Sequence, residues 1–263
     1  MDLIVCSWCQ SQNPGGTTSC DVCGAPLDDA VKVSDGGWRE APRLHDMAEF
    51  SFGTSTCQVE GDVVPVAELK LGQGDSIYFE HHVLLWKDEA VPITVMNTPG
   101  RSLGGMPSVV TVASGPGRVA VSRDAAGEMV VLPMHPSMEI DVREHAFLAA
   151  SASISYSFVR IKGLANVLHG GNGMYMDRFV TQGGPGLLLL HGNGNVFERL
   201  LAPGEKMLLE PGAFLFKDAS VQMNTHQLPV KTGLLSRGMY LAEMTGPGRI
   251  GIQSMYVHHG SDD

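Results

Sequence analysis

Aromatic residues, charged residues and long hydrophobic runs are all scarce in this chain of 263 residues. Phe, Trp and Tyr together make up 6% of it and charged residues 17%, whereas 43% is hydrophobic, so wholesale disorder is excluded. The longest apolar run, Leu187 to Leu190, is far shorter than the roughly 18 residues of a membrane-spanning helix. We therefore expect no transmembrane segment, while peripheral membrane association stays open.

Basic residues are the scarcer of the two charge types. The chain has 18 of them against 28 acidic residues, which gives a net charge of -10. A surface of that sign repels nucleic acid, so nucleic acid is a disfavoured partner. The first residues also lack the basic and apolar regions of a secretory signal, which predicts a cytoplasmic location.

Glycine and proline, in contrast, are abundant. The 32 glycines and 15 prolines are scattered along the chain as isolated turn signals, a distribution typical of many short strands. Runs with the period of a helix are rare. The composition therefore predicts an all-β protein.

Four of the five cysteines occur near the start of the chain as two C-x-x-C pairs. Two such pairs can offer four thiolates to one tetrahedral zinc ion, and a filled coordination shell makes that metal structural. Paired disulfides are the alternative, which the missing export signal disfavours. Residues 1–27 are thus predicted to form a zinc ribbon whose ligands are Cys6, Cys9, Cys20 and Cys23.

The spacing of these cysteines, with Asn13 between the pairs and Gly24 after the last, resembles zinc fingers of the Ran-binding-protein type. Some members of that group bind ubiquitin or single-stranded RNA. The ubiquitin binders carry Thr-Phe where this chain has Gln10-Ser11, and RNA binders need arginines, which are missing before Arg39. The resemblance therefore implies the zinc ligands and not the class of partner.

The remainder of the chain divides by composition and repetition. Residues 28–46 have no sustained apolar period and are predicted to be a linker, residues 47–258 a β-domain, and residues 259–263 a tail. Within the β-domain, Gly74-Asp75, Glu80 and Lys87-Asp88 recur in the same order as Gly204-Glu205, Glu210 and Lys217-Asp218. A third copy lies at Ser137 to Ser151, where polar and apolar residues alternate as in an amphipathic strand.

Gly-Pro-Gly segments mark the repeat a second time. They begin at Gly115, Gly184 and Gly246, each is followed by an apolar run, and each is predicted to reverse the chain. The repeats are accordingly placed near 60–118, 119–186 and 187–248. We expect a final strand, 250–257, to pair beside the first repeat and close the array, because closure removes exposed edges.

Several motifs in this region resemble the mitochondrial biogenesis family named for altered inheritance of mitochondria. They are Pro203-Gly204-Glu205, the Gly-Ala-Phe-Leu-Phe run from Gly212, and Gly238-Met239-Tyr240 followed by Thr-Gly-Pro-Gly from Thr245. The resemblance begins at Met47 and implies a triplicated double-stranded β-helix, similar to the fold of the tryptophan RNA-binding attenuation protein. A fungal member is implicated in organising the mitochondrial inner membrane. The family has no established catalytic residues.

Catalytic signatures are missing from the sequence as well. Metal-dependent enzymes of the double-stranded β-helix type use His-x-His on one strand with a carboxylate nearby, whereas His81-His82 are adjacent and should diverge on a strand. Cys57 stands alone and is expected to be a packed strand residue. Met174 to Met176 and Met239 to Leu241 are the candidate contact surfaces if exposed, with burial as the alternative.

The sequence predicts a non-catalytic binding or scaffold protein, not an enzyme. In this interpretation the β-domain forms a homo-oligomer, and the zinc ribbon, with structural Zn2+ as the cofactor, recruits a protein partner. A nucleic-acid-binding protein that uses the ribbon and the β-domain is the first alternative. A metal-dependent enzyme of the double-stranded β-helix type is the second.

Overall fold

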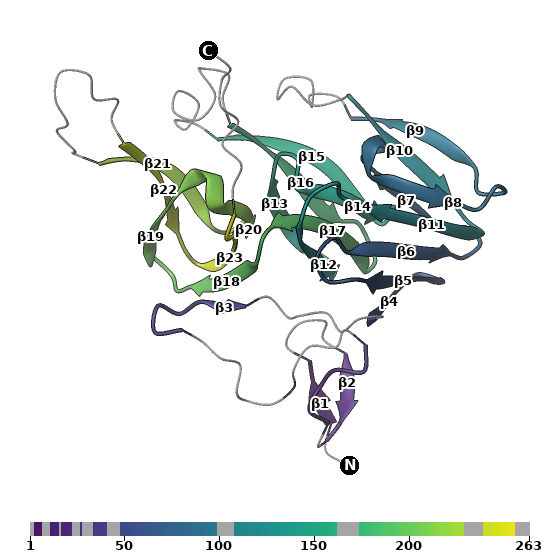
Figure 1. Ribbon diagram of the computed structural model, residues 1–263. Coiled ribbons are helices and arrows are strands. Elements are labelled where there is room, and N and C mark those ends of the chain that lie inside the picture. Colours follow the sequence, from purple (N-terminus) through teal and green to yellow (C-terminus); the bar gives the residue numbers. More distant parts are fainter. Residues whose placement is uncertain are drawn as a thin grey trace.

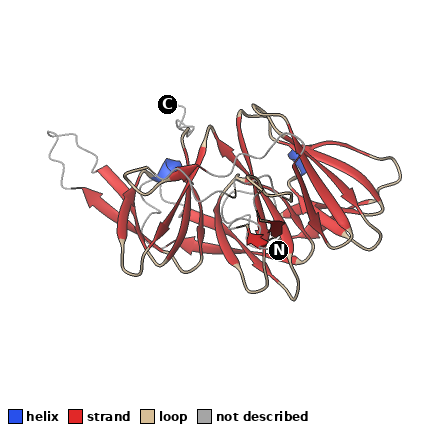
Figure 2. Ribbon diagram, turned by 90° about the horizontal axis from the view of Figure 1, so that it is seen from below, coloured by secondary structure: helices blue, strands red, loops and turns tan. Residues whose placement is uncertain are grey.

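A computed structural model describes residues 3–6, 11–15, 17–22, 27, 34–40, 48–98, 108–161, 174–228 and 239–255. These residues form antiparallel strands in five sheets, with short 3-10 turns as the only helical elements of the described ranges (Figures 1 and 2). The expected all-β fold is confirmed. The predicted tail, 259–263, lies outside the described residues.

Eighteen strands fall into three consecutive groups of six, which we call the first, second and third units. The first unit contains β6 (Val66–Leu71), β7 (Ser76–Phe79), β8 (Leu84–Lys87), β9 (Ile93–Asn97), β10 (Val109–Ser114) and β11 (Gly117–Ser122). The second contains β12 (Gly127–Met134), β13 (Glu139–Arg143), β14 (Phe147–Ser151), β15 (Ile154–Ile161), β16 (Met174–Thr181) and β17 (Gly186–Asn193). The third contains β18 (Val196–Leu201), β19 (Lys206–Leu209), β20 (Phe214–Asp218), β21 (Gln222–Leu228), β22 (Met239–Thr245) and β23 (Gly248–Gln253).

The order of strand pairing is the same in every unit. The sixth strand pairs with the first and third strands of its own unit. The fifth strand pairs with the second and fourth. Even the irregularity recurs, because the third and sixth strands of each unit pair with a register shift. Each unit therefore contributes three strands to each of two sheets.

Neighbouring units share sheets. The second strand of the first unit, β7, pairs with the third strand of the second unit, β14, and β13 pairs with β20 in the same way. These contacts build a six-stranded sheet, β12-β17-β14-β7-β10-β9, and a seven-stranded sheet, β15-β16-β13-β20-β23-β18-β3. The units consequently follow one another along the molecule, with the first and third at opposite ends (Figure 1).

Each Gly-Pro-Gly segment joins strands of different sheets, β10 to β11, β16 to β17 and β22 to β23. One expectation about the repeat is wrong. The final strand, predicted at 250–257, is β23, and it pairs with β18 and β20 of its own unit rather than beside the first repeat. Both edges of a sixth strand are occupied by its own unit, so it cannot close the array. For the same reason the units run from 66 to 122, 127 to 193 and 196 to 253, past the predicted boundaries.

The N-terminal residues attach at both ends of this array. Strands β4 (Ala48–Phe52) and β5 (Ser55–Glu60) extend the sheet of the first unit to give the order β4-β5-β6-β11-β8. Strand β3 (Arg39–Glu40), within the predicted linker 28–46, pairs with β18 of the third unit. The linker prediction is thus wrong for these residues, because a two-residue pairing with a sheet edge leaves no periodic signal. Strands β1 (Leu3–Val5) and β2 (Gln12–Pro14) form a separate pair.

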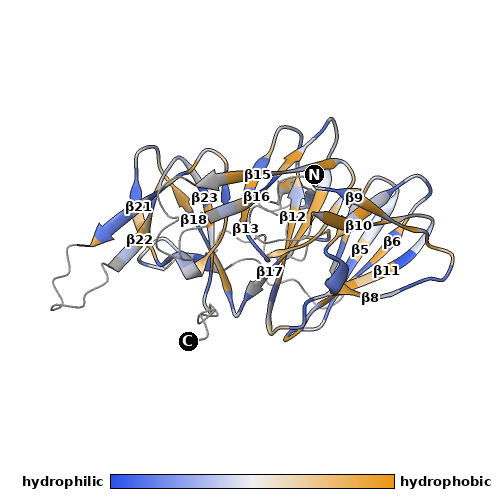
Figure 3. Ribbon diagram, turned by 90° about the horizontal axis from the view of Figure 1, so that it is seen from above, coloured by the Kyte–Doolittle hydropathy of each residue, from blue (hydrophilic) through white to orange (hydrophobic). Residues whose placement is uncertain are grey.

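Buried hydrophobic residues form three clusters, one centred on each unit. Hydrophobic residues follow the strands of all three units (Figure 3). The largest fully buried side chains include Phe79, Phe147, Phe179, Phe214 and Phe216. Four of these rings, all except Phe179, lie on strands that pair with a neighbouring unit. Their burial therefore stabilises the units and their junctions together.

Candidate functional site

The predicted zinc ribbon is described only in part. Cys6 and Cys20 are buried and both approach Ser11: the Cys6 N–H donates to the Ser11 carbonyl at 2.9 Å, and the Ser11 hydroxyl lies 3.0 Å from the Cys20 sulfur. Asn13 is fully buried, and its side chain accepts a hydrogen bond from the Asp21 N–H at 2.8 Å. The fold thus brings one cysteine of each pair to the same hairpin. Cys9 and Cys23 lie outside the described residues.

A group of paired charges around a buried carboxylate lies where the second unit meets the third. The Asp141 carboxylate, 0% exposed, accepts from the Arg178 guanidinium at 2.6 Å and from the Lys217 ammonium at 2.6 Å. Burial alone would raise the pKa of Asp141, but the hydrogen bonds from Arg178 and Lys217 and their charges outweigh it and hold that pKa below its ordinary value. We call these three residues the charged junction. It links β13, β16 and β20, and its charges pair with one another to hold these strands together.

A second buried carboxylate connects the N-terminal segment to the third unit. Glu198 lies 3.4 Å from Arg39 of β3 and 3.7 Å from Arg249 of β23. Burial raises the pKa of Glu198, and the two guanidinium groups offset that rise only in part. The sequence patterns pointed to neither carboxylate, because each is recognisable only beside cations that are distant along the chain.

The described histidines are distributed over several strands and turns. His191 is buried in β17 with its Nε2 3.1 Å from the Ala125 carbonyl. His226 lies 3.6 Å from Glu243. Within the described ranges, potential metal-ligand atoms gather only at Glu80, His81 and His82, within 4.8 Å of one another. Burial and the neighbouring charge of Arg123 lower the pKa of His82.

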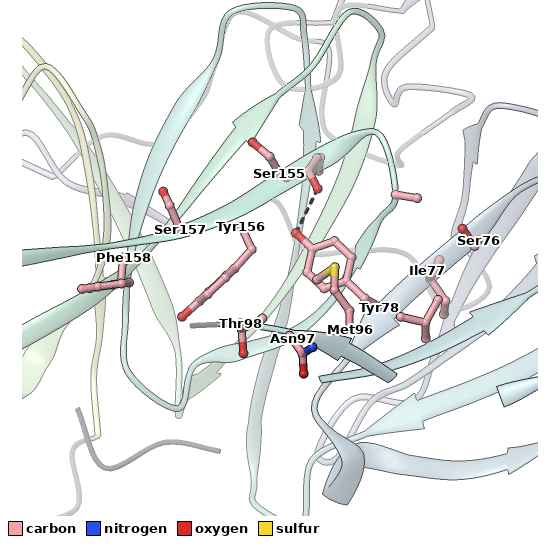
Figure 4. A pocket seen from close by; sticks show the side chains of 13 residues that line it. Ser76, Ile77, Tyr78, Met96, Asn97, Thr98, Ser155, Tyr156, Ser157 and Phe158 are labelled. Carbon is pink, nitrogen blue, oxygen red and sulfur yellow. Dashed lines mark hydrogen bonds between the residues drawn. The ribbon is translucent and has the colours of Figure 1, made fainter. Parts of the chain in front are cut away.

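A cavity of about 680 Å3 lies between the first and second units (Figure 4). Its wall is mainly apolar and comes from β7, β9, β10 and β15. The Tyr78 hydroxyl donates to the Ile154 carbonyl at 3.1 Å, and the Tyr156 hydroxyl donates to Asp177 at 2.5 Å. Thr98 is 2% exposed, and its hydroxyl has no hydrogen-bond partner among the described residues. The cavity can enclose an apolar group that carries one polar atom, and no sequence motif indicated it.

The remaining candidates are core residues. Cys57 lies fully buried in β5, and burial raises the pKa of its thiol to about 12, so the expectation of a packed strand residue is confirmed. Of the methionine-rich segments, Met176 is buried in the core of the third unit, and Tyr240 and Leu241 are half-buried. The described part of these segments therefore packs within the domain.

The protein is thus a series of antiparallel β-sheet units in which buried charges join the strands. Residues 57–255 match the family model described as Mitochondrial biogenesis AIM24, and the chain belongs to this family. The family resemblance predicted from the sequence is therefore confirmed.

A solved structure shares this fold. The X-ray crystal structure of protein SPYM3_0169 from Streptococcus pyogenes superposes with a TM-score of 0.60 at 21% sequence identity, over 77% of this chain and 94% of that one. No curated protein matches. A search of the described residues for a helix long and apolar enough to cross a membrane found none.

Proposed function

We propose that the chain is a non-catalytic binding or scaffold protein built from three copies of one double-stranded β-helix module. The observation that carries the proposal is the pairing order, which is the same in all three units down to the register shift between third and sixth strands. A repeated module of this kind stabilises its neighbours by sharing sheets with them. The product is an elongated platform rather than a single pocket.

The disposition of the charged groups supports a structural role. Asp141 lies at the boundary between the second and third units, and Glu198 joins β3 to the third unit. Each of these buried carboxylates contacts two cations on other strands. Groups tied in this way lock strands together and are not poised to exchange protons with a substrate. Glu80, His81 and His82 are consecutive residues, whereas enzymes of the double-stranded β-helix type gather their metal ligands from several strands.

The N-terminal hairpin completes the proposal. Cys6, Cys9, Cys20 and Cys23 would hold one structural Zn2+, and the buried Asn13 would fix the segment that carries the second pair. The ribbon then presents a surface to a protein partner, while the β-domain forms a homo-oligomer. A cytoplasmic location belongs to the same proposal.

Sedimentation and metal analysis test the two parts separately. We compare the full chain with a chain lacking residues 1–27 and with a Cys6→Ser, Cys20→Ser double variant. The expected result is one zinc per full chain, none in either variant, and the same oligomer in all three. A second zinc equivalent retained by the variants would support a metal enzyme instead. Monomers at every concentration would contradict the scaffold.

A further inference from the structure

The two junctions between units use one register. Phe79 lies opposite Ala149, and Val142 lies opposite Phe216, at equivalent places in the strands. The next two pairs at each junction are equivalent as well. The Tyr78–Ala150 pair corresponds to Asp141–Lys217, and the Ile77–Ser151 pair corresponds to Ile140–Asp218. Each junction is thus the same contact between the second strand of one unit and the third strand of the next.

One third strand and one second strand take part in neither junction. The third strand of the first unit, β8, is the end strand of its sheet, and the second strand of the third unit, β19, is the end strand of a three-stranded sheet, β19-β22-β21. Within the described residues neither has a strand neighbour on its outer side. They lie at opposite ends of the molecule (Figure 1), too far apart to meet within one chain.

Both strands carry apolar side chains that are exposed. Leu85 and Trp86 of β8 are 54% and 40% exposed. The residues at the same two places in the other units are all 0% exposed; they are Leu148 and Ala149 in β14 and Leu215 and Phe216 in β20. On β19, Leu208 is 40% exposed, whereas Tyr78 and Asp141 at the same place are 3% and 0% exposed. Exposed apolar side chains on an unpaired edge favour the addition of a strand.

We propose that β19 of one copy pairs with β8 of the next copy, so that the third unit of one chain and the first unit of another repeat the internal junction. This inference rests on the proposed scaffold function and specifies the contact between copies in its homo-oligomer. By the shared register, Trp86 would lie opposite Leu209, Lys87 opposite Leu208, and Asp88 opposite Met207. The contact joins different surfaces, so repetition gives a ring if the rotation closes and a filament if it does not.

Backbone orientation agrees with this pairing. The Gly246 N–H donates to the Glu205 carbonyl, which turns the polar backbone groups of residues 205, 207 and 209 toward β22. The N–H and C=O of Leu208 therefore point away from β22, to the outer edge. The Asp88 N–H likewise bonds the Arg118 carbonyl of β11, so the backbone of Lys87 points outward. The two edges offer donors and acceptors at the places that the register requires.

The start of the junction is also complementary in charge. At the internal junction, the Arg143 side chain at the end of β13 donates to the Gly212 carbonyl of the turn before β20. Glu210 occupies the place of Arg143 at the end of β19, and His81-His82 occupy the place of the turn in the first unit. Between copies, an acidic residue would thus face two imidazoles, an attractive or neutral pairing.

Disulfide trapping tests the register. Hydrogen bonds from the Glu80 N–H to the Leu148 carbonyl and from the Ala152 N–H to the Ser76 carbonyl flank the Phe79–Ala149 pair, which is therefore a non-hydrogen-bonded pair. Such pairs have Cα atoms about 4.5 Å apart, a separation that a disulfide spans. Trp86→Cys and Leu209→Cys, each in the full chain, should form a linked dimer when mixed and oxidised, and neither should do so alone.

The controls separate the alternatives. The unmodified chain accounts for its native cysteines, and Leu208→Cys mixed with Trp86→Cys tests a side chain one residue out of register. The pair Asp88→Cys and Met207→Cys repeats the test with Trp86 retained. Dimers of Trp86→Cys alone would show β8 pairing with itself and overturn the inference. Oligomers without either mixed cross-link would overturn it while leaving the scaffold, and monomers at every concentration would contradict both.

Discussion

The two internal junctions share one register but are built from different chemistry. The junction between the first and second units is aromatic, with Tyr78 and Phe179 packed on Phe147 at ring-centre distances of 5.6 and 4.9 Å. At the same place the junction between the second and third units carries Asp141 and Lys217. The strand pairing is therefore a property of the backbone and its corners, and each junction fills the space with its own residues. Substitutions that affect one junction and spare the other measure this difference.

The largest effect is expected from Asp141→Ala. The change leaves the Lys217 ammonium, 5% exposed, without its buried carboxylate, and breaking a buried pair costs about 3–5 kcal/mol. Denaturant unfolding measures the loss. The double variant Asp141→Leu, Lys217→Met replaces the pair by apolar groups and should recover most of it. A loss below 1 kcal/mol in the single variant would show that the pair does not hold the junction.

The same carboxylate gives the charged junction a pH dependence. The pKa of Asp141 is lower in the folded chain than its ordinary value, so its contribution to stability is complete above that value, about 3.9, and is lost as the pH falls through the lower folded pKa. The difference in unfolding free energy between the wild-type chain and Asp141→Asn should be constant from pH 7 to 5 and shrink below pH 4. A difference in unfolding free energy that grows as the pH falls would contradict this prediction. Glu198, whose pKa is raised, is present in both chains and cancels.

A smaller loss is expected at the aromatic junction from Tyr78→Phe. The change removes the hydroxyl that donates to the Ile154 carbonyl and keeps the ring, so the cost is about 1 kcal/mol, the net worth of one hydrogen bond. Thermal or denaturant unfolding of this variant beside Asp141→Ala ranks the two junctions. A loss as large as that of Asp141→Ala would mean that the aromatic junction depends on its polar atoms as well.

The smallest effect concerns the corner before each second strand. Gly74, Ser137 and Gly204 occupy this corner in the three units with φ of +86°, +72° and +75°, a region in which only glycine is unstrained. Ser137→Gly should therefore stabilise the chain by about 0.5 kcal/mol, the relief of strain less the entropy of glycine. Gly204→Ala has open space for its Cβ and should lose about 1 kcal/mol through φ alone. A loss of stability in Ser137→Gly, or a gain in Gly204→Ala, would show that the corners are not equivalent.

Local patterns predicted the strands well and their neighbours poorly. Alternation from Met138 to Arg143 predicted β13, because period two is a local property of the backbone. The same alternation placed Asp141 on a polar face, yet the structure buries it, since Lys217 arrives from a strand that only the fold brings close. Gly-Pro-Gly at Gly246 predicted a turn of the chain but not the sheet that follows it. The expected closure of the array was wrong because β23 pairs with strands of its own unit.

The units repeat one contact, and by our proposal the outer edges of β8 and β19 complete it between copies. Sedimentation velocity of the wild-type chain and of Leu208→Pro over a range of concentrations tests it most directly. Proline removes an N–H that faces outward and spares the bonds to β22, and Leu208→Ala controls for the lost side chain. We predict concentration-dependent assembly of the wild-type chain and a folded monomer for Leu208→Pro. Assembly of Leu208→Pro equal to that of the wild-type chain would show that β19 does not pair with β8 of another copy.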